Sequence, residues 1–239
     1  MNVLNDLVGY KNLKIYQNTD MFKFSLDSVL LPNFVTISAR TKKILDIGCG
    51  NAPISLILTT KTKAHITAVE IQKEVCELAK KTVEYNKLEN QITVINDDIN
   101  NLYKKLESDV YDVIICNPPY FKVNSNSKLN EKEYKVIARH ELSLNLENLF
   151  KISRKLLKNN GVIAIVHRPE RLVEIIEIMK KNNIEPKKIQ FVYPKKNIDA
   201  NILLIEGRKK GKPGLKILPP IYVHEESGEY TQNIKKYFE

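Results

Sequence analysis

Short apolar runs alternate with longer amphipathic stretches from residue 43 onward. The apolar runs are four to six residues long and predict buried strands, and the nearly continuous run Tyr111–Cys116 is typical of a central strand in a parallel sheet. Between the runs, Ile71–Leu88 carries apolar residues at helical spacing. The predicted strands are Lys43–Ile47, Ala64–Val69, Ile92–Ile95, Tyr111–Cys116, Val162–Val166, Ile189–Tyr193 and Ile202–Ile205, and the predicted helices are a segment that starts at Pro53, then Ile71–Leu88, Leu142–Leu157 and Pro169–Asn182.

This order of elements predicts an α/β fold with a mostly parallel sheet and helices on both faces. Residues 194–200 are too few for a crossover, so the last two strands should pair antiparallel and close a seven-stranded sheet. Asn159-Asn160-Gly161 is expected to end the preceding helix with a left-handed cap. The expected organisation is one domain, 1–239, with an N-terminal preamble, 1–40, and a C-terminal tail, 215–239, that contains a short helix at Tyr230–Phe238.

Polar residues follow successive predicted strands, where ligands of such sheets bind. Asp46 lies in the first strand and is followed by Gly48-Cys49-Gly50, a turn that lets a ligand approach the main chain. The third glycine of a dinucleotide fingerprint is replaced here by Pro53, so a cofactor without phosphate fits better. Glu70 is placed to bind ribose hydroxyls and Asp98 an adenine amino group, although acids at strand ends also serve as helix caps.

Asn117-Pro118-Pro119-Tyr120 follows the most apolar strand. An exocyclic amine of adenine is a poor nucleophile because its lone pair is delocalised into the ring. If the Asn117 side-chain oxygen and the Pro118 carbonyl each accept one amino hydrogen, the lone pair is turned toward an incoming methyl group. The two prolines fix the backbone, and Tyr120 can stack on the base. A glutamine amide poses the same electronic problem, so the motif alone does not choose between the two substrates.

The three acids and the Gly-x-Gly turn match the S-adenosylmethionine site of Rossmann-like class I methyltransferases. Residues 17–31, together with ILDIGCGNAP and CNPPYF, resemble the bacterial tRNA adenine-N6 methyltransferase family, which modifies the adenine beside the anticodon of valine tRNA. The likeness runs from about residue 8 to residue 238. It implies that Phe24, Ser25 and Asp27 help to close the cofactor site. The cofactor-binding residues implied are Ser25, Asp27, Asp46, Gly48, Gly50, Glu70, Ile71, Asp98, Ile99 and Asn117.

The formal net charge of +10 and the isoelectric point near 9.3 indicate an anionic partner, which the resemblance identifies as a tRNA anticodon stem-loop. Lysine supplies 32 of the 38 basic residues, so part of the charge is an ordinary solvated surface. Between Lys180 and Lys216, however, eleven basic residues face three acids. Arg139 and His140 have either a substrate or a surface role. The residues expected to contact RNA are Phe121, Lys195, Lys196, Arg208, Lys209, Lys210 and Lys212.

Other features narrow the class of protein. Cys49, Cys76 and Cys116 have neither disulfide nor zinc-ligand spacing, so we expect reduced thiols and no metal. No apolar run reaches membrane-spanning length and no secretory signal is apparent, so a cytoplasmic monomer is expected. The alternatives left open are methylation of rRNA bases, DNA bases or a protein glutamine, and a non-catalytic RNA-binding protein. Forty residues are too few for the helical domain that glutamine methyltransferases usually carry, and no DNA target-recognition domain is visible.

Overall fold

The computed structural model describes residues 2–7, 9–10, 12–18, 25–118 and 144–237. The strands are β1 (Asn2–Asp6), β2 (Lys14–Asn18), β3 (Lys43–Ile47), β4 (His65–Glu70), β5 (Ile92–Asn96), β6 (Tyr111–Cys116), β7 (Leu157–His167), β8 (Ile184–Tyr193), β9 (Ile202–Lys209), β10 (Lys216–Ile217) and β11 (Ile221–Tyr222). The helices are α1 (Leu26–Phe34), α2 (Pro53–Thr59), α3 (Lys73–Tyr85), α4 (Ile99–Lys105), α6 (Leu146–Leu156), α7 (Leu172–Lys181) and α8 (Gln232–Lys235).

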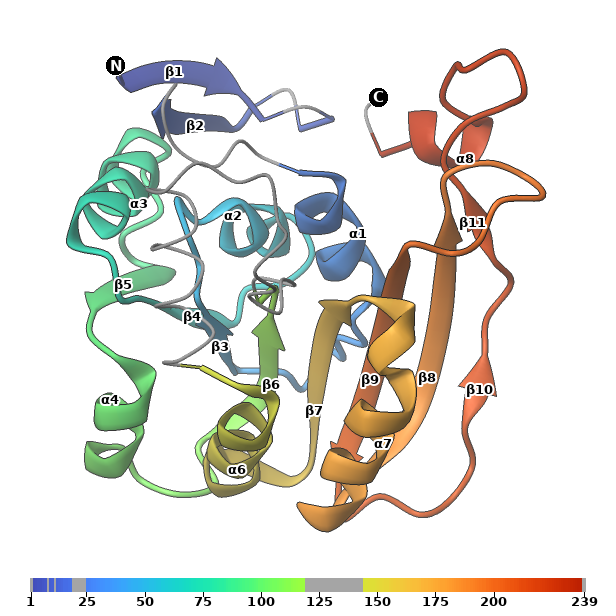
Figure 1. Cartoon of the computed structure of the whole chain (residues 1–239). Helices are drawn as coiled ribbons and strands as arrows, with labels where there is room; N and C mark the ends of the chain where they lie inside the picture. The colour runs from blue at the N-terminus through green and yellow to red at the C-terminus, as the bar shows by residue number, and fades with distance from the viewer. Residues whose placement is uncertain (1, 8, 11, 19–24, 119–143, 238–239) are drawn as a thin grey trace, which may run out of the picture.

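The body of the molecule is one twisted sheet in the order β10-β8-β9-β7-β6-β3-β4-β5 (Figure 1). From β5 to β7 all neighbours are parallel, whereas β9 is antiparallel to both β7 and β8. The predicted mostly parallel sheet with an antiparallel closing strand is therefore confirmed. The two-residue strands β10 and β11 extend the far side of β8 and were not predicted, because two residues show no periodicity.

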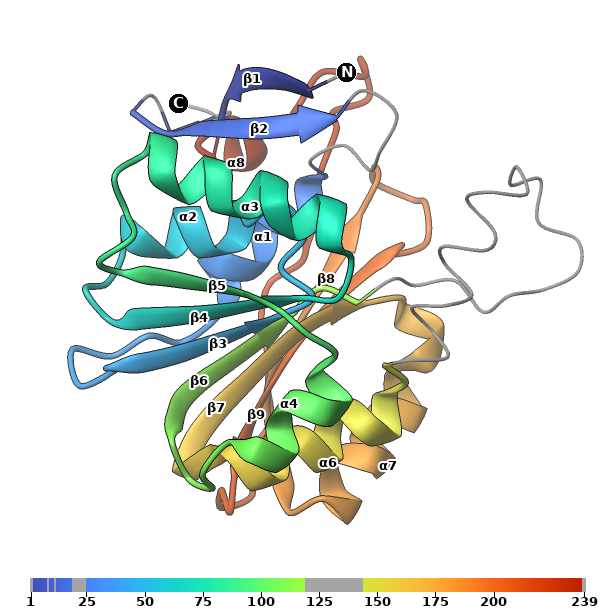
Figure 2. The same ribbon diagram turned by 90° about the vertical axis from the view of Figure 1, so that its left-hand side faces the viewer.

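Helices cover both faces of the sheet (Figure 2). α1, α2 and α3 lie on one face together with α8, and α4, α6 and α7 lie on the other. Alternate residues of β6 face the two layers: Val113 and Ile115 pack with the first set of helices, and Ile114 and Cys116 with the second. Because both faces are buried, the strand is apolar throughout, which explains the continuous run in the sequence.

The N-terminal preamble contains an antiparallel hairpin, β1 paired with β2, which the sequence did not predict. The hairpin docks on α3 through side chains of that helix and its C-terminus. The Lys14 backbone N–H donates to Asn86 Oδ1 at 2.9 Å, and Asn86 Nδ2 donates back to the Lys14 carbonyl at 2.7 Å. The Tyr16 N–H donates to Thr82 Oγ1 at 3.0 Å. These are tertiary contacts, so the local pattern of the segment carried little signal for its conformation.

The predicted helix end at 159–161 is wrong. α6 ends at Leu156, and β7 begins with the next residue, which pairs with Tyr111 of β6. Asn160 does adopt the left-handed conformation, with φ of 64°, but it does so inside β7. The register shifts there, and pairing resumes between Val162 and Val113. The Asn-Asn-Gly sequence therefore makes a β-bulge and not a helix cap.

Several smaller features agree with the sequence. Pro53 occupies the first turn of α2, and Pro169 begins a short 3-10 turn, Pro169–Arg171, that leads into α7. All three cysteines are buried free thiols. No helix within the described residues has the length and apolar character needed to cross a membrane.

Candidate active site

The register of the parallel strands aligns the predicted site residues. The last residue of β3 pairs with Val69 of β4 and with Cys116 of β6. The residues at the next position, Gly48, Glu70 and Asn117, therefore leave the sheet side by side at its carboxyl edge. Because neighbouring strands lie about 4.8 Å apart, Asn117 starts one strand spacing from the Gly48 turn, and Glu70 starts one spacing away on the other side.

The turn after β3 is shaped for close approach of a ligand to the backbone. Gly48 and Gly50 have φ of 69° and 58°, and a Cβ added at either would meet no atom within 4 Å. Open space therefore lies where side chains would otherwise stand. Ala52, which departs from the commoner sequence of this turn, also has a positive φ, 70°, and caps α2. The loop shape that the sequence left open is thus a turn with three left-handed residues.

Asp46 is fully buried beneath this turn. Its Oδ2 accepts a hydrogen bond from Ser55 Oγ at 2.6 Å, whereas Oδ1 has no partner within the described part of the chain. Burial raises the pKa of the Asp46 carboxyl to about 7; the Ser55 hydrogen bond lowers it in part, and the neighbouring charge of Glu70 raises it further. A buried carboxyl with an empty oxygen is the kind of group that a bound cation completes.

Glu70 ties the turn to β4. Its Oε2 accepts the Gly50 N–H at 3.0 Å, and Oε1 accepts the Gln72 N–H at 2.9 Å. The side chain is only 3 % exposed. Each carboxylate oxygen keeps a second lone pair, so Glu70 orients the glycine turn and retains the capacity to accept hydrogen bonds from a diol.

Beyond β4 and β5 the structure combines an exposed apolar side chain with capped helix starts. Ile71 is 40 % exposed directly after Glu70, while Ile99 is buried in α4. Asp98 is the N-cap of α4 and accepts from the Asn100 N–H at 2.8 Å, as the alternative role of such acids anticipated. Asn96, which the sequence analysis missed, donates from Nδ2 to the carbonyls of Glu70 and Ile71 at 2.8 and 3.1 Å. Its signal was a lone amide at the end of an apolar strand.

The N-terminal segment reaches the same turn. Asn51 Nδ2 donates to the Tyr16 carbonyl of β2 at 2.7 Å, which fixes the hairpin to the loop that follows Gly50. Ser25 is exposed at the N-terminus of α1, and Asp27 lies in its first turn. Phe24 falls outside the described residues. Asn51 was also missed, because only the tertiary position of the hairpin gives it a partner.

The motif after β6 is described at its first two positions. Asn117 is half-buried and Pro118 is buried at the end of the strand. The other predicted substrate residues near this motif, Pro119, Tyr120, Phe121, Arg139 and His140, lie outside the described residues.

β7 contributes a basic cluster beside this motif that the sequence analysis did not select. Cys116 pairs with Ile165, so His167 leaves the sheet next to Pro118. His167 is buried, and burial together with the Arg171 charge lowers its pKa to about 4, so the ring is neutral at pH 7. Its Nδ1 accepts the Arg168 N–H at 2.8 Å. The Arg171 guanidinium forms two hydrogen bonds with Glu174, at 2.8 and 2.5 Å.

The predicted RNA-contact residues divide between two edges of the sheet. Lys195 and Lys196 follow β8, which is parallel to β7, and so lie at the edge of the candidate site. Because β9 runs in the opposite direction, its C-terminal end and the residues after it lie at the other edge. The residues placed there are Arg208, Lys209, Lys210 and Lys212.

Lys209 does not suit the predicted RNA-binding role. Its side chain is buried, and Nζ donates to Asp109 Oδ1 and to the Leu157 carbonyl, both at 2.7 Å. Its charge is therefore used inside the molecule, where it joins the end of β9 to the start of β7. The sequence counted this lysine with its exposed neighbours because burial of one residue in a basic run leaves no local pattern.

Comparison with known proteins decides the family. The model of the family described as "Methyltransferase small domain" matches residues 23–184. This chain belongs to that family. The methyltransferase is 30% identical over 237 residues to the tRNA1(Val) (adenine(37)-N6)-methyltransferase of Parabacteroides distasonis, with 98% of each chain covered. It is 32% identical over 199 residues to the protein of the same name from Aliivibrio salmonicida, covering 83% of this chain and 79% of that protein.

Solved structures share the fold of the methyltransferase. A protein from Agrobacterium tumefaciens described as a predicted O-methyltransferase superposes with a TM-score of 0.70 at 20% identity, covering 89% of this chain and 95% of that one. Geranyl diphosphate C-methyltransferase from Streptomyces coelicolor, solved with S-adenosyl-L-homocysteine, gives a TM-score of 0.58 at 10% identity, covering 76% and 79%. The class I methyltransferase fold expected from the sequence is confirmed.

Proposed function

We propose that this protein transfers the methyl group of S-adenosylmethionine to N6 of an adenine in tRNA, the base 3′ of the anticodon in valine tRNA, in the cytoplasm. The observation that carries the proposal is the row formed by the Gly48 turn, Glu70 and Asn117 at one edge of the sheet. The family and the names of relatives that align over most of the chain support the same reaction. The sequence-based assignment is thereby retained.

The residues of the turn suit a cofactor of this kind. The space over Gly48 and Gly50 admits a ligand against the main chain, and Glu70 has lone pairs for ribose hydroxyls. Ile71 offers an exposed apolar surface to an adenine ring. The empty Oδ1 of Asp46 favours a positive charge nearby. The cofactor supplies an activated methyl group on a positively charged sulfur.

Asn117 and Pro118 hold the substrate amine in this proposal. The amide oxygen and the backbone carbonyl each accept one amino hydrogen, which directs the nitrogen lone pair at the methyl group. The new N–C bond forms as the C–S bond breaks, and one amino proton is then released to solvent. The gain comes mainly from proximity and orientation. The adenine must leave its stack to reach this position.

The RNA backbone on either side of that adenine passes residues of the same sheet edge. Arg168 leaves β7 there, with Nη1 bonded to the Asn201 carbonyl at 2.8 Å and further N–H groups available for phosphate oxygens. Lys195 and Lys196 follow β8 two strands farther along. These three residues replace the wider set expected from the sequence as the RNA contacts near the reaction.

The function is tested by incubating the full chain with labelled S-adenosylmethionine and total tRNA, followed by digestion to nucleosides. We expect N6-methyladenosine as the labelled product, in valine tRNA and at one position. Label in another nucleoside, or in protein, would contradict the proposal. Failure of S-adenosylhomocysteine to bind in calorimetry would instead favour a non-catalytic protein.

Asn117→Ala tests the role of the acceptor pair. Removal of one of two groups that orient the reacting atom should lower kcat on the order of 10² to 10³-fold. The affinity for S-adenosylhomocysteine, measured by calorimetry, should stay within about threefold of the parent protein. Asn159→Ala, which removes an exposed amide at the opposite edge, is the matched control and should leave kcat unchanged. Equal rates in Asn117→Ala and the parent would refute the mechanism.

A further inference from the structure

The positive charge of the protein is concentrated at the edge of the sheet opposite the candidate site. Seven connecting segments lie there, where the parallel strands begin and β9 ends. Together they hold eighteen lysines and arginines against five aspartates and glutamates, a net charge of +13 compared with +10 for the whole chain. The segments are 35–43, 59–65, 85–91, 104–112, 154–161, 180–187 and 208–212.

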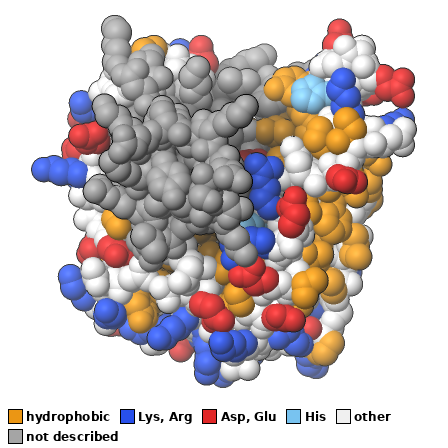
Figure 3. Space-filling model, in the orientation of Figure 1, with side chains coloured by type: hydrophobic (Ala, Val, Ile, Leu, Met, Phe, Trp, Pro, Cys, Tyr) orange, Lys and Arg blue, Asp and Glu red, His pale blue; other side chains and the backbone are white. Residues whose placement is uncertain are grey.

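The rest of the chain consequently carries a net charge of −3. In Figure 3, Lys and Arg side chains gather along the lower rim, below α6 and α7. We name the seven segments the basic edge. Its charge dominates the field of the molecule and attracts a polyanion to this side first.

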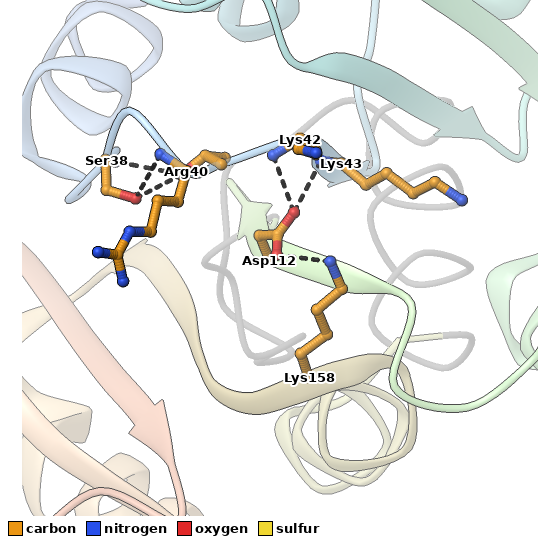
Figure 4. Close-up of polar contacts among 7 residues, drawn as sticks. Ser38, Arg40, Lys42, Lys43, Asp112 and Lys158 are labelled. Carbon is orange, nitrogen blue, oxygen red and sulfur yellow. Dashed lines mark hydrogen bonds and ion pairs between the residues drawn. The ribbon is translucent and has the colours of Figure 1, made fainter.

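The acids of the basic edge are mostly neutralised within the protein. Asp112 Oδ2 accepts the backbone N–H groups of Lys42 and Lys43 at 2.9 Å each, and Oδ1 accepts Lys158 Nζ at 2.7 Å. Burial alone would raise the pKa of Asp112, but these three donors lower it overall. In Figure 4 the side chains of Arg40 and Lys43 extend away from Asp112. The backbone thus satisfies the acid while the lysine side chains stay exposed.

A hollow of about 740 Å³ opens in the basic edge between two of its segments. Three lysines and five hydroxyl side chains line it, with no acid among the lining residues. The hydroxyls cap nearby backbone groups: Thr60 Oγ1, for example, donates to the Ile57 carbonyl at 2.7 Å. Lys61 Nζ donates to Asn33 Oδ1 at 2.5 Å, which fixes that ammonium at the wall. The polar lining residues are Ser38, Thr41, Lys42, Thr59, Thr60, Lys61, Thr62 and Lys63.

Helix ends explain only part of this charge. The last turns of α4, α6 and α7 each carry two basic residues, as expected at the negative ends of helix dipoles. α2 has no basic residue in its last turn, and the segment 35–43 follows an irregular connection and not a helix end. The lysines of the hollow therefore need a different explanation.

We infer that the hollow and the basic edge around it bind the phosphate backbone of RNA, at a surface separate from the edge where the adenine reacts. Three ammonium groups and no acid suit successive phosphates, which Lys binds as a point charge. Arg208, Lys210 and Lys212, which the sequence assigned to RNA, lie at this same edge. They belong to this surface and not to the reaction edge.

The surface and the reaction edge are close enough for one RNA molecule. β3 joins them with five residues, which span about 16 Å at roughly 3.3 Å per residue. An RNA arm that presents its loop at one edge and runs along the side of the sheet reaches the other edge. This inference rests on the proposed function, since RNA is the polyanion to which it commits.

The test is the triple substitution Lys42→Gln, Lys61→Gln and Lys63→Gln in the full chain, with tRNA binding measured by fluorescence anisotropy from 50 to 300 mM salt. Loss of three phosphate contacts should lower the slope of log Kd against log salt by roughly two to three and weaken binding on the order of tenfold at 150 mM. Calorimetry with S-adenosylhomocysteine and the melting temperature should be unchanged.

The matched control is Lys81→Gln, Lys151→Gln and Lys236→Gln, three exposed lysines outside the basic edge that alter the net charge equally. Its slope should change by less than one. Equal slopes in the two triple variants would overturn the inference, even where tRNA is still methylated. Absence of tRNA methylation by the parent protein would defeat the proposed function instead. If the triple variant does not fold, Lys63→Gln alone should lower the slope by about one, and no change would count against the inference.

Discussion

Two buried carboxylates, Asp46 and Glu206, differ in how completely their oxygens are bonded. Glu206 accepts the Thr36 N–H at 2.7 Å and the Thr36 hydroxyl at 2.9 Å, and it pairs with Lys188 Nζ at 3.1 Å. The same ammonium donates to the Phe34 carbonyl at 2.6 Å and lies 4.4 Å from the centre of the Phe34 ring. Asp46 has Ser55 on one oxygen and nothing within the described residues on the other.

The difference separates a structural role from a binding role. The Glu206 network joins the end of α1 to β8 and β9, and every buried atom of the pair has a partner. A half-satisfied carboxyl stabilises nothing by itself, and it persists where a ligand completes it. The empty oxygen beneath the glycine turn is therefore a better indicator of the cofactor site than burial or charge alone.

The largest effect should follow from breaking the satisfied network. Glu206→Ala leaves the Lys188 ammonium buried without its partner, so we expect a loss of about 3 to 5 kcal/mol in the free energy of unfolding, measured in urea. Binding of S-adenosylhomocysteine should be retained at temperatures where the variant is folded. Glu177→Ala, which removes an exposed carboxylate of α7, is the control and should change stability by less than about 0.5 kcal/mol. A similar small change for Glu206→Ala would mean that the network does not stabilise the fold.

Asp46→Asn should change how stability depends on pH. In the folded protein Asp46 keeps its proton up to pH about 7, whereas an unfolded aspartate loses it near pH 4. The native state binds more protons in this window, so this group's contribution to stability falls as pH rises from 4 to 7 and is constant above it. The amide removes the dependence. The difference in unfolding free energy between parent and variant should therefore decline by up to about 4 kcal/mol across the window.

The comparison with the variant is needed because His167 acts in the opposite sense. Its folded pKa of about 4 lies below the ordinary value of 6.5, so its contribution to stability is lost as pH falls through that interval. The two slopes partly cancel in the parent protein. Urea unfolding at pH 5, 6, 7 and 8 gives the difference directly. A difference that does not vary with pH would show that Asp46 is ionised throughout and that the empty oxygen has another explanation.

The fold was predictable to the extent that it depends on local pattern. β6 matches its predicted bounds because both faces of the strand are buried and every residue is apolar. The N-terminal hairpin was missed because it is held by Asn86 and Thr82, 72 and 66 residues away along the chain. The end of α6 was misjudged because Asn-Asn-Gly suits a helix cap and a β-bulge equally well. Tertiary pairing decided between them.

The candidate site shows the same limit. Asp46, Glu70 and Asn117 were identified because the ends of parallel strands meet at one edge, which topology alone dictates. The division of the basic residues was missed because it depends on the reversed direction of β9. Net charge counted along the sequence gave one patch, whereas the sheet separates it into two surfaces at opposite edges. Ser55 was seen only as a helix residue, since nothing local shows that it bonds Asp46.

Ser55→Ala should have the smallest effect and the most specific one. The Ser55 hydroxyl lowers the pKa of Asp46 by donating to its charged form, so its removal costs more when Asp46 is ionised. We expect a loss of about 2 kcal/mol at pH 8 and about 1 kcal/mol at pH 5 by urea unfolding. Ser153→Ala is the control, because that buried hydroxyl donates to the Leu149 carbonyl at 2.7 Å and its loss should not depend on pH. Equal losses for Ser55→Ala at both pH values would show that the serine bonds a carboxyl whose charge does not change, which would remove the contrast with Glu206.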